Sequence, residues 1–335
     1  MADNPGYSRA HSYNNADRTH ADISSEICGV KLDNPTILAS GILGVSGSSL
    51  CNVAKNGAGA LTTKSIGMEP RKGHPCPVIL TYGQGMVNAV GLSNAGAEES
   101  IAEIEYAKKH SGVPVIASIF ASTEKEFGAV AGEISKAGPD LIEANISCPN
   151  VESEFGRPFG ADPKVSARVT KEVKKNSNIP VIVKLTPNVS SIGDVAKAVA
   201  KAGADAINAI NTVGPGMVIN IEAARPILSN RKGGISGPAI KPIAVRCVYD
   251  VYEALKQQGK EERIPIIGTG GVACGRDAVE MIMAGASAVG MGTAVYSRGI
   301  DVFRKVSMEM KGFMQKEGYE SISSMRGITH EKDRG

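Results

Sequence analysis

The feature that most constrains the fold is an alternation that runs along most of the chain. Short apolar or β-branched runs recur, each followed by a turn-forming residue and then by a longer stretch with helical spacing of apolar positions. The runs lie at residues 36–40, 60–65, 113–120, 141–147, 180–185, 206–211, 265–271 and 288–293. Near-continuous apolar character is typical of strands covered on both faces, as in a parallel sheet. About eight such units predict an α/β fold of the (β/α)8 TIM-barrel type, with a doubly wound sheet as the alternative.

No segment within this alternation has the composition of a linker between domains. Residues 1–24 are polar, rich in Asn, Ser and Asp, and show no periodicity, so we predict a loose tail there. The widest gap between runs, residues 212–264, holds one clear helical pattern preceded by a long loop. The prediction is therefore a single domain over residues 25–335.

Composition excludes several classes of function. The net charge of +3 is too small to indicate a nucleic acid or an acidic membrane surface as partner. No apolar run reaches the ~18 residues of a membrane span, and the N-terminus lacks the apolar segment of a secretory signal. The six cysteines form no CxxC pair and have no histidine at metal-ligand spacing, so neither a metal site nor a disulfide scaffold is expected. These features predict a cytoplasmic protein.

Functional groups of a (β/α)8 barrel gather at the C-terminal ends of its strands. In this chain those positions hold lysines, amides, hydroxyls, a thiol and glycine pairs. They are Ser40, Lys64, Ser65, Ser118, Asn145, Cys148, Lys184, Asn211, Thr212, Gly270, Gly271, Gly292 and Thr293. Lysines inside apolar strands, as in "LTTKSIG" and "VIVKLTP", are hard to explain as solvated surface, so Lys64 and Lys184 are predicted to be functional.

The last two strands end in "GTGGV" and "GMGT". Barrels often bind a phosphate at these two strand ends through backbone N–H groups. "GTGGVA" also fits a loose dinucleotide-binding fingerprint, but no acidic residue ends a strand about 20 positions later. A phosphate cradle is the better interpretation.

Two further segments carry polar groups. In the loop at residues 85–96, Asn88 and Asn94 could bind the edges of an amide-rich ligand, and ordinary turn chemistry explains them equally well. Cys148 directly follows a strand, yet among the histidines only His74 lies in a strand-end loop, which gives little support to a Cys–His nucleophile. A thiol without a histidine can still act as a general base or acid.

Together the motifs resemble those of a known family. "NISCPNV", "TTKSIG…PR", "GMVNAVGLSNAG", "VIVKLTPNV", "NAINTVG", "GGISGPAIKP", "IPIIGTGGV" and "AVGMGT" are similar to the motifs of dihydroorotate dehydrogenases of class 1, and the match spans residues 27–306. "NISCPNV" and "GGISGPAIKP" look most like the class 1B catalytic subunit.

The resemblance implies an FMN-containing barrel that oxidises dihydroorotate to orotate in the synthesis of pyrimidines (UMP). It implies that Cys148 is the base at C5, that the hydride leaves C6 for flavin N5, and that Lys184 lies at the N1/O2 edge of the flavin. Residues implied to bind substrate are Lys64, Asn88, Ala89, Val90, Gly91, Leu92, Asn145, Asn150, Asn211 and Thr212. Residues implied to bind FMN are Ser40, Lys64, Ser65, Ser118, Asn145, Lys184, Ile210, Gly237, Gly270, Gly271, Gly292 and Thr293. The loop around 148–160 would act as a lid.

The chain departs from the family pattern in three places. Ser118 stands where the family usually has Asn near the flavin, "ESEFGRPFG" replaces a more glycine-rich lid, and the N-terminal tail is extra. The first change removes one expected flavin contact, and the second leaves the closing of the lid open.

Class 1B subunits usually pair with an electron-transfer subunit that carries FAD and a 2Fe–2S cluster and reduces NAD+. The resemblance therefore implies a homodimer that can join such subunits in a heterotetramer. Alternatives are a class 1A enzyme that uses fumarate and a flavoenzyme like dihydropyrimidine dehydrogenase, although the latter tends to have His where Asn150 stands. A Schiff-base aldolase would use Lys184 and leave Cys148 without a role, and a barrel that only binds ligands is the remaining alternative.

Overall fold

The computed structural model describes residues 21–147 and 159–332. Eight parallel strands close into a barrel, in which each strand pairs with its neighbours in chain order and the last pairs with the first. The strands are β3 (Thr36–Leu38), β4 (Ala60–Thr62), β7 (Val115–Ile119), β8 (Leu141–Asn145), β9 (Val181–Leu185), β10 (Ala206–Ala209), β15 (Ile266–Thr269) and β16 (Ala288–Met291). Each lies within one of the eight apolar runs. The (β/α)8 prediction is confirmed, and the doubly wound alternative is wrong because the sheet closes on itself.

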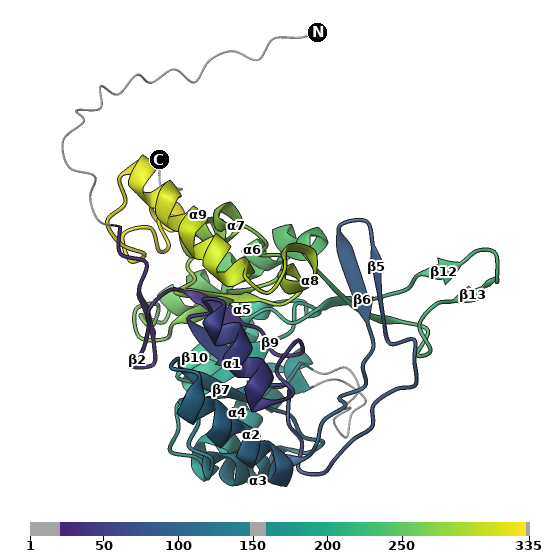
Figure 1. The fold of residues 1–335 in the computed structure, drawn as a ribbon. Helices are drawn as coiled ribbons and strands as arrows, with labels where there is room; N and C mark the ends of the chain where they lie inside the picture. Colours follow the sequence, from purple (N-terminus) through teal and green to yellow (C-terminus); the bar gives the residue numbers. More distant parts are fainter. Residues whose placement is uncertain (1–20, 148–158, 333–335) are drawn as a thin grey trace.

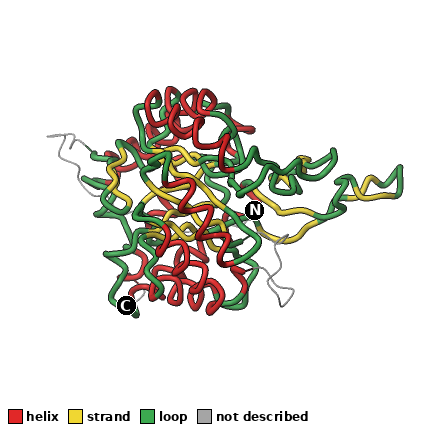
Figure 2. Tube along the Cα trace, turned by 90° about the horizontal axis from the view of Figure 1, so that it is seen from below, coloured by secondary structure: helices red, strands yellow, loops and turns green. Residues whose placement is uncertain are grey.

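Helices surround the barrel (Figures 1 and 2). They are α1 (Gly47–Lys55), α2 (Ala97–His110), α3 (Glu124–Ser135), α4 (Pro163–Asn176), α5 (Ile192–Lys201), α6 (Lys241–Lys256), α7 (Gly275–Met283), α8 (Ala294–Arg298), α9 (Val302–Glu317) and α10 (Thr329–Lys332), with 3-10 turns η1 (Phe159–Ala161) and η2 (Pro238–Ile240). Local sequence sets their starts: the Asp162 carboxylate caps α4 before Pro163, and the Ser191 hydroxyl caps α5. Val195 and Val199 of α5 are buried, as their spacing predicts.

An apolar layer closes the N-terminal end of the barrel. The hairpin of β1 (Ser25–Ile27) and β2 (Val30–Leu32) inserts Ile27 and Leu32 into a cluster with inward side chains such as Ile116, Ile182 and Ile267. Beyond this layer the interior becomes polar, since Glu143 and Lys184 are both buried. The fold therefore leaves the C-terminal end of the barrel for polar chemistry.

A second sheet, which the sequence did not predict, lies beyond the C-terminal ends of the barrel strands. It is antiparallel, in the order β11 (Val213–Gly216), β14 (Gly233–Ser236), β6 (Gly85–Asn88) and β5 (Ile79–Tyr82). The short pair β12 (Ile219–Asn220) and β13 (Arg225–Pro226) extends away from the barrel as an arm (Figures 1 and 2). The treatment of Gly85–Asn88 and of the segment after Thr212 as loops was therefore wrong. The strands β6, β11 and β14 contain glycine and lack an apolar alternation, so they carry no strand signal.

The described chain begins with packed residues. The Ala21 side chain is fully buried, and the Asp22 N–H donates to the Glu320 carbonyl at 2.8 Å, beyond the end of α9. Ala21 and Asp22, which the prediction places in the tail, thus contact the rest of the protein, and residues 1–20 lie outside the described residues. No helix in the described ranges has the length and apolar character that crossing a membrane requires.

Candidate functional site

A buried ion pair occupies the interior of the barrel near its C-terminal end. The Lys184 side chain projects from β9 and the Glu143 side chain from β8, and the two residues are 4% and 1% exposed. Lys184 Nζ lies 3.6 Å from Glu143 Oε1, which is longer than a normal hydrogen bond. Among the residues that the structure describes, no acceptor lies within hydrogen-bonding distance of the Lys184 ammonium. Its charge is balanced by Glu143, while the described residues leave its three N–H donors without an acceptor.

Glu143 is held by two neutral donors. The Ser118 hydroxyl donates to Oε1 at 3.1 Å, and the Asn208 amide donates to Oε2 at 2.7 Å. The Thr269 hydroxyl in turn donates to Asn208 Oδ1 at 2.7 Å. Sequence reasoning missed Glu143, Asn208 and Thr269. The signal was present, because Glu143 in "LIEAN" is a charged residue within an apolar run, as both predicted lysines are.

Ser65 joins four of the predicted positions into one network. Its hydroxyl lies 3.2 Å from that of Ser40 and 2.9 Å from that of Ser118, and it accepts from the Asn145 amide at 3.1 Å. Ser118 therefore connects this network to Glu143. In place of the usual asparagine, this serine is a hydroxyl link between Ser65 and the buried carboxylate.

The amide of Asn145 extends the network toward the next strand ends. Asn211 Nδ2 donates to Asn145 Oδ1 at 3.2 Å, and Asn211 Oδ1 accepts from the Thr212 N–H at 2.8 Å. Asn145 also pairs with Lys184 in the register of β8 and β9. Asn145, Asn211 and Thr212 are thus brought together beside Lys184, as the sequence predicts.

Lys64 differs from Lys184 in having no counter-charge among the residues that the structure describes. Its side chain is half-buried at the end of β4, and burial lowers the pKa of its ammonium below the usual value. In the described part of the chain no carboxylate forms an ion pair with it. An unpaired, partly desolvated ammonium is a ready binding group for an anion.

The segment from Asn88 to Leu92 lies next to the C-terminal end of the barrel, and Gly234 contacts both. Asn88 pairs with Gly234 across β6 and β14, and a Cβ at Gly234 would meet Thr212 Oγ1 at 2.2 Å. Asn88 and Thr212 are therefore both neighbours of this glycine. His74 secures the segment, since its Nδ1 donates to the Ala89 carbonyl and its backbone N–H to the Val90 carbonyl, both at 3.0 Å.

The next residues of the segment are turn elements. Gly91 and Leu92 both have positive φ angles, of 76° and 59°. Asn94 Oδ1 accepts from the backbone N–H groups of Gly67 and Gly96, and its amide donates to the Leu92 carbonyl. For Asn94 the turn interpretation is therefore the correct one.

The glycines after β15 and β16 belong to segments with unpaired backbone donors among the described residues. Gly270 and Gly271 adopt φ angles of 130° and 79°. The N–H groups of Gly271, Gly292 and Thr293 find no acceptor among the described residues. A Cβ at Gly292 would make only an ordinary van der Waals contact, at 3.8 Å from Ala39 Cβ, whereas a Cβ at Gly271 would meet Lys241 Cβ at 2.6 Å.

Two more predicted residues adjoin these strand ends. Gly237 lies against Thr293, since its Cβ would be 3.2 Å from Thr293 Cγ2, and the Thr293 hydroxyl donates to Ser236 Oγ at 2.9 Å. Ile210 lies beside Gly270, whose Cβ would be 3.4 Å from Ile210 Cγ1. Ile210, Gly237, Gly270 and Thr293 are therefore neighbours at one end of the barrel.

Comparison with known proteins addresses the family. The family model described as dihydroorotate dehydrogenase matches residues 22–314. A Methanosarcina mazei protein named dihydroorotate dehydrogenase B (NAD(+)), catalytic subunit, is 47% identical over 317 residues, which are 94% of this chain and 98% of that protein. The Thermoplasma acidophilum protein of the same name is 48% identical over 308 residues, 92% of this chain and 99% of that protein. The chain belongs to the dihydroorotate dehydrogenase family. The resemblance in the motifs is thereby confirmed.

The donors at the mouth fit the flavin that this family uses. Among the described residues, neither the Lys184 ammonium nor the backbone N–H groups of Gly271, Gly292 and Thr293 have a hydrogen-bond acceptor. A buried cation and a neutral cradle of N–H groups match the electron-accepting ring and the phosphate of FMN. The residues present are thus compatible with FMN.

Cys148 and Asn150, both predicted site residues, lie outside the described residues, as does most of the lid predicted around 148–160. The residue before Cys148 is described: the Ser147 hydroxyl donates to the Lys184 carbonyl at 2.7 Å, which fixes the end of the β8 segment against β9. The other five cysteines are free thiols. Cys51 and Cys247 are buried, as a small apolar role predicts, whereas Cys76 is exposed.

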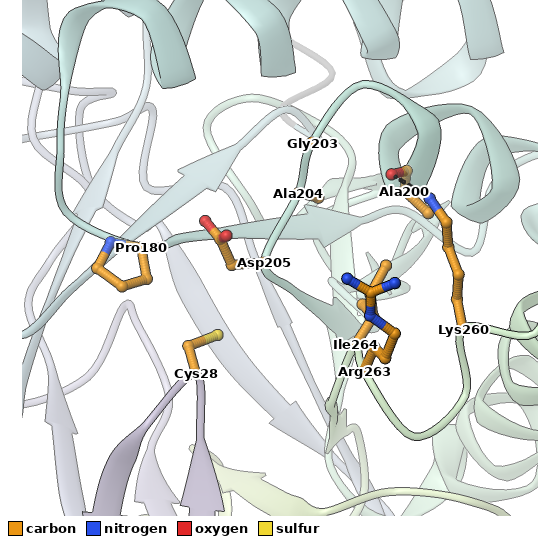
Figure 3. A pocket seen from close by; sticks show the side chains of 9 residues that line it. All are labelled: Cys28, Pro180, Ala200, Gly203, Ala204, Asp205, Lys260, Arg263 and Ile264. Atoms are coloured by element: carbon orange, nitrogen blue, oxygen red, sulfur yellow. Dashed lines mark hydrogen bonds between the residues drawn. The ribbon is translucent and has the colours of Figure 1, made fainter.

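A cavity of about 390 Å³ lies at the opposite end of the barrel (Figure 3). Two of its polar side chains, those of Asp205 and Lys260, serve the fold. The Asp205 carboxylate accepts from Lys174 Nζ at 2.6 Å and from the Val181 N–H at 2.7 Å, and Lys260 Nζ donates to the Ala200 carbonyl at 2.9 Å. Burial raises the pKa of the Cys28 thiol beside this cavity to about 12, so the thiol is unreactive at neutral pH. This end of a barrel usually serves stability.

Proposed function

We propose that this chain is the catalytic subunit of an NAD+-linked dihydroorotate dehydrogenase, which oxidises dihydroorotate to orotate in pyrimidine (UMP) synthesis. The observation that carries the proposal is the meeting of Lys64, Lys184, Asn145 and Asn211 at one end of the barrel, in a chain nearly half identical to relatives of that name. FMN, when bound, supplies the acceptor for the hydride that leaves C6 of the substrate.

Lys184 and the glycine cradle would hold FMN. The Lys184 ammonium is fixed in the barrel interior, so it can face the N1/O2 edge of the flavin, where negative charge grows on reduction. Around it, Ser40, Ser65, Ser118 and Ile210 line the ring and the ribityl chain in this proposal. Gly237, Gly270, Gly271, Gly292 and Thr293 contribute backbone to the phosphate site.

Lys64 and the amides would hold dihydroorotate. The substrate carries one carboxylate, and Lys64 offers a half-buried ammonium that has no carboxylate partner in the described ranges. Asn88, Asn145, Asn150 and Asn211 supply donors and acceptors for the edges of the pyrimidine ring, with Thr212 and the backbone of Ala89, Val90, Gly91 and Leu92. Binding of the carboxylate would restore a counter-charge to Lys64.

Cys148 is proposed as the general base. It takes the proton from C5 as the hydride leaves C6, so that both C–H bonds break and the C5=C6 double bond forms. A thiol can serve this role, because a cation near a thiol lowers its pKa below the ordinary value near 8.5. The lid after Cys148 would exclude water during this transfer.

Electron transfer onward needs a second protein. The relatives are named as catalytic subunits, and we propose that this chain likewise joins an electron-transfer subunit carrying FAD and a 2Fe–2S cluster, which reduces NAD+. A homodimer of this chain within a heterotetramer is part of the proposal. Free thiols at Cys28, Cys51, Cys76, Cys247 and Cys274 are typical of a reducing compartment, in line with a cytoplasmic location.

The test is anaerobic mixing of the purified FMN-loaded chain with dihydroorotate. We expect a yellow protein whose flavin absorbance bleaches, and Cys148→Ala should retain FMN but bleach at least ~100-fold more slowly, since general base catalysis contributes about 10²–10⁴. Cys76→Ala, which removes an exposed thiol, is the matched control and should bleach at the wild-type rate. A colourless protein that borohydride traps on a carbonyl substrate through Lys184 would refute the proposal in favour of an aldolase.

Assays of the acceptor decide the subclass. Turnover with NAD+ that requires a co-purified subunit supports the class B assignment. Turnover of the isolated chain with fumarate would instead indicate the class 1A alternative. Rapid reduction by dihydrouracil with no response to dihydroorotate would indicate an enzyme like dihydropyrimidine dehydrogenase.

A further inference from the structure

Glu143 is a buried carboxylate to which the proposed chemistry gives no task. It is 1% exposed, and burying an ion costs several kcal/mol that a well-packed apolar side chain would not cost. Its two oxygens are directed by named donors, the Ser118 hydroxyl and the Asn208 amide. A carboxylate held in this way has a fixed position, so the geometry of the charge it carries is fixed as well.

The position of this charge is informative. Glu143 Oε1 stands 3.6 Å from Lys184 Nζ, close enough for a strong Coulomb interaction in a buried site and too far for a normal hydrogen bond. The carboxylate thus balances the ammonium charge without occupying its N–H groups. A shorter contact would have directed one N–H of Lys184 at Glu143 and away from a ligand.

The support behind the carboxylate is continuous. Thr269 of β15 donates to Asn208 of β10, and Asn208 donates to Glu143 of β8. On the other side Ser65 of the β4 segment contacts Ser118 of β7, which donates to Glu143. Donors from both sides of the barrel therefore hold Glu143 in place, and no single strand can shift it without breaking a hydrogen bond.

We propose that Glu143 is a positioning residue that holds the Lys184 ammonium and sets how strongly this cation favours reduced flavin. The inference rests on the proposed function, in which Lys184 faces the flavin edge. A fixed negative charge next to Lys184 weakens the field of the cation where the flavin gains negative charge on reduction. Glu143 therefore keeps the flavin more strongly reducing than Lys184 alone would make it, which favours passing the electrons on.

The test is the midpoint potential of FMN bound to the full-length chain. Glu143→Gln removes the charge, and a glutamine can still accept from Asn208 and donate to Ser118 Oγ. In this variant we expect the ratio of the affinity for reduced FMN to that for oxidised FMN to rise at least tenfold. For a two-electron couple, a tenfold rise is a positive shift of the midpoint potential by about 30 mV. Lys184→Met should shift the midpoint potential in the negative direction. In the Lys184→Met background, Glu143→Gln should change the potential much less than it does in the wild type.

A second variant keeps the inference testable if glutamine impairs folding. Glu143→Asp keeps the charge but withdraws it by one methylene group, so we expect a shift in the same direction of about threefold in that affinity ratio. A purely structural role would lower the urea midpoint of these variants and leave the potential unchanged, and that result overturns the inference. If the wild type binds FMN and Glu143→Gln leaves its midpoint potential unchanged, this inference alone is refuted. A wild-type chain that binds no FMN refutes the proposed function as well.

Discussion

The strongest prediction for stability concerns the pair Glu143–Lys184 in the FMN-free chain. At 3.6 Å and an effective permittivity of about 20, the attraction between two unit charges is about 5 kcal/mol. Both ions are buried, so each would remain desolvated without its partner. We expect Lys184→Met alone and Glu143→Gln alone each to lower the free energy of unfolding by about 3–5 kcal/mol.

The double variant discriminates between pairing and local packing. With both charges gone, neither ion is left unpaired, so the loss should be smaller than the sum of the single losses by at least ~2 kcal/mol. Because the chain has no Trp, far-UV circular dichroism in a urea titration is the suitable probe. The exposed pair Lys136–Glu133 provides a matched control. Its Nζ–Oε2 distance is shorter, at 2.7 Å, yet its coupling should stay below ~0.5 kcal/mol because water screens it.

Additive single effects at Glu143 and Lys184, within ~0.5 kcal/mol, would refute the reasoning. Such a result would mean that the two side chains are solvated or displaced in the free protein. A coupling that collapses in 1 M salt would contradict it as well, because salt screens exposed pairs far more than buried ones.

Two further perturbations test other parts of the structure. Gly290→Ala would place its Cβ 2.0 Å from Thr269 Oγ1, so overpacking should lower the free energy of unfolding in urea by about 2–3 kcal/mol. Gly312 lies in helix α9, and a Cβ there would have nothing within 4 Å, so Gly312→Ala should raise the free energy of unfolding by about 0.5–1 kcal/mol. Equal effects of the two substitutions would contradict the steric argument drawn from these distances. The raised pKa of Cys28, about 12 against about 9 unfolded, means that its contribution to stability is complete below pH 9 and is lost as the pH rises toward 12. Between pH 8 and pH 10.5 the free energy of unfolding of the wild type should therefore fall by up to about 2 kcal/mol more than that of Cys28→Ala. Parallel pH profiles of the two proteins would refute a buried thiol.

The barrel could be predicted from the sequence because its strands are covered on both faces. Each strand appears as a compact apolar run, and the runs recur at spacings that leave room for a helix. The same logic located Lys64 and Lys184, since a charged residue inside such a run needs a reason. Applied evenly, it would also have located Glu143 and Asn208.

The antiparallel sheet beside the mouth could not be predicted in this way. β6 and β14 pair although they are far apart in the chain, and Gly233 and Gly234 in β14 leave no apolar alternation. Their glycines are explained only by the assembled structure, in which a Cβ at Gly233 would meet the Asn88 carbonyl at 2.3 Å. Close approach of two backbones is a tertiary requirement, and a single sequence does not reveal which segments approach each other.

The two proposed ligand sites at the mouth differ in their charge. Among the described residues, Lys64 and Lys184 contribute two positive charges and Glu143 one negative charge, and these three sum to one positive charge. Since Glu143 already balances Lys184, the excess charge belongs to Lys64, which matches a substrate with a single carboxylate. The phosphate cradle, in contrast, is built from the neutral N–H groups of Gly271, Gly292 and Thr293. A substrate analogue without its carboxylate should therefore lose affinity through Lys64 while FMN stays bound.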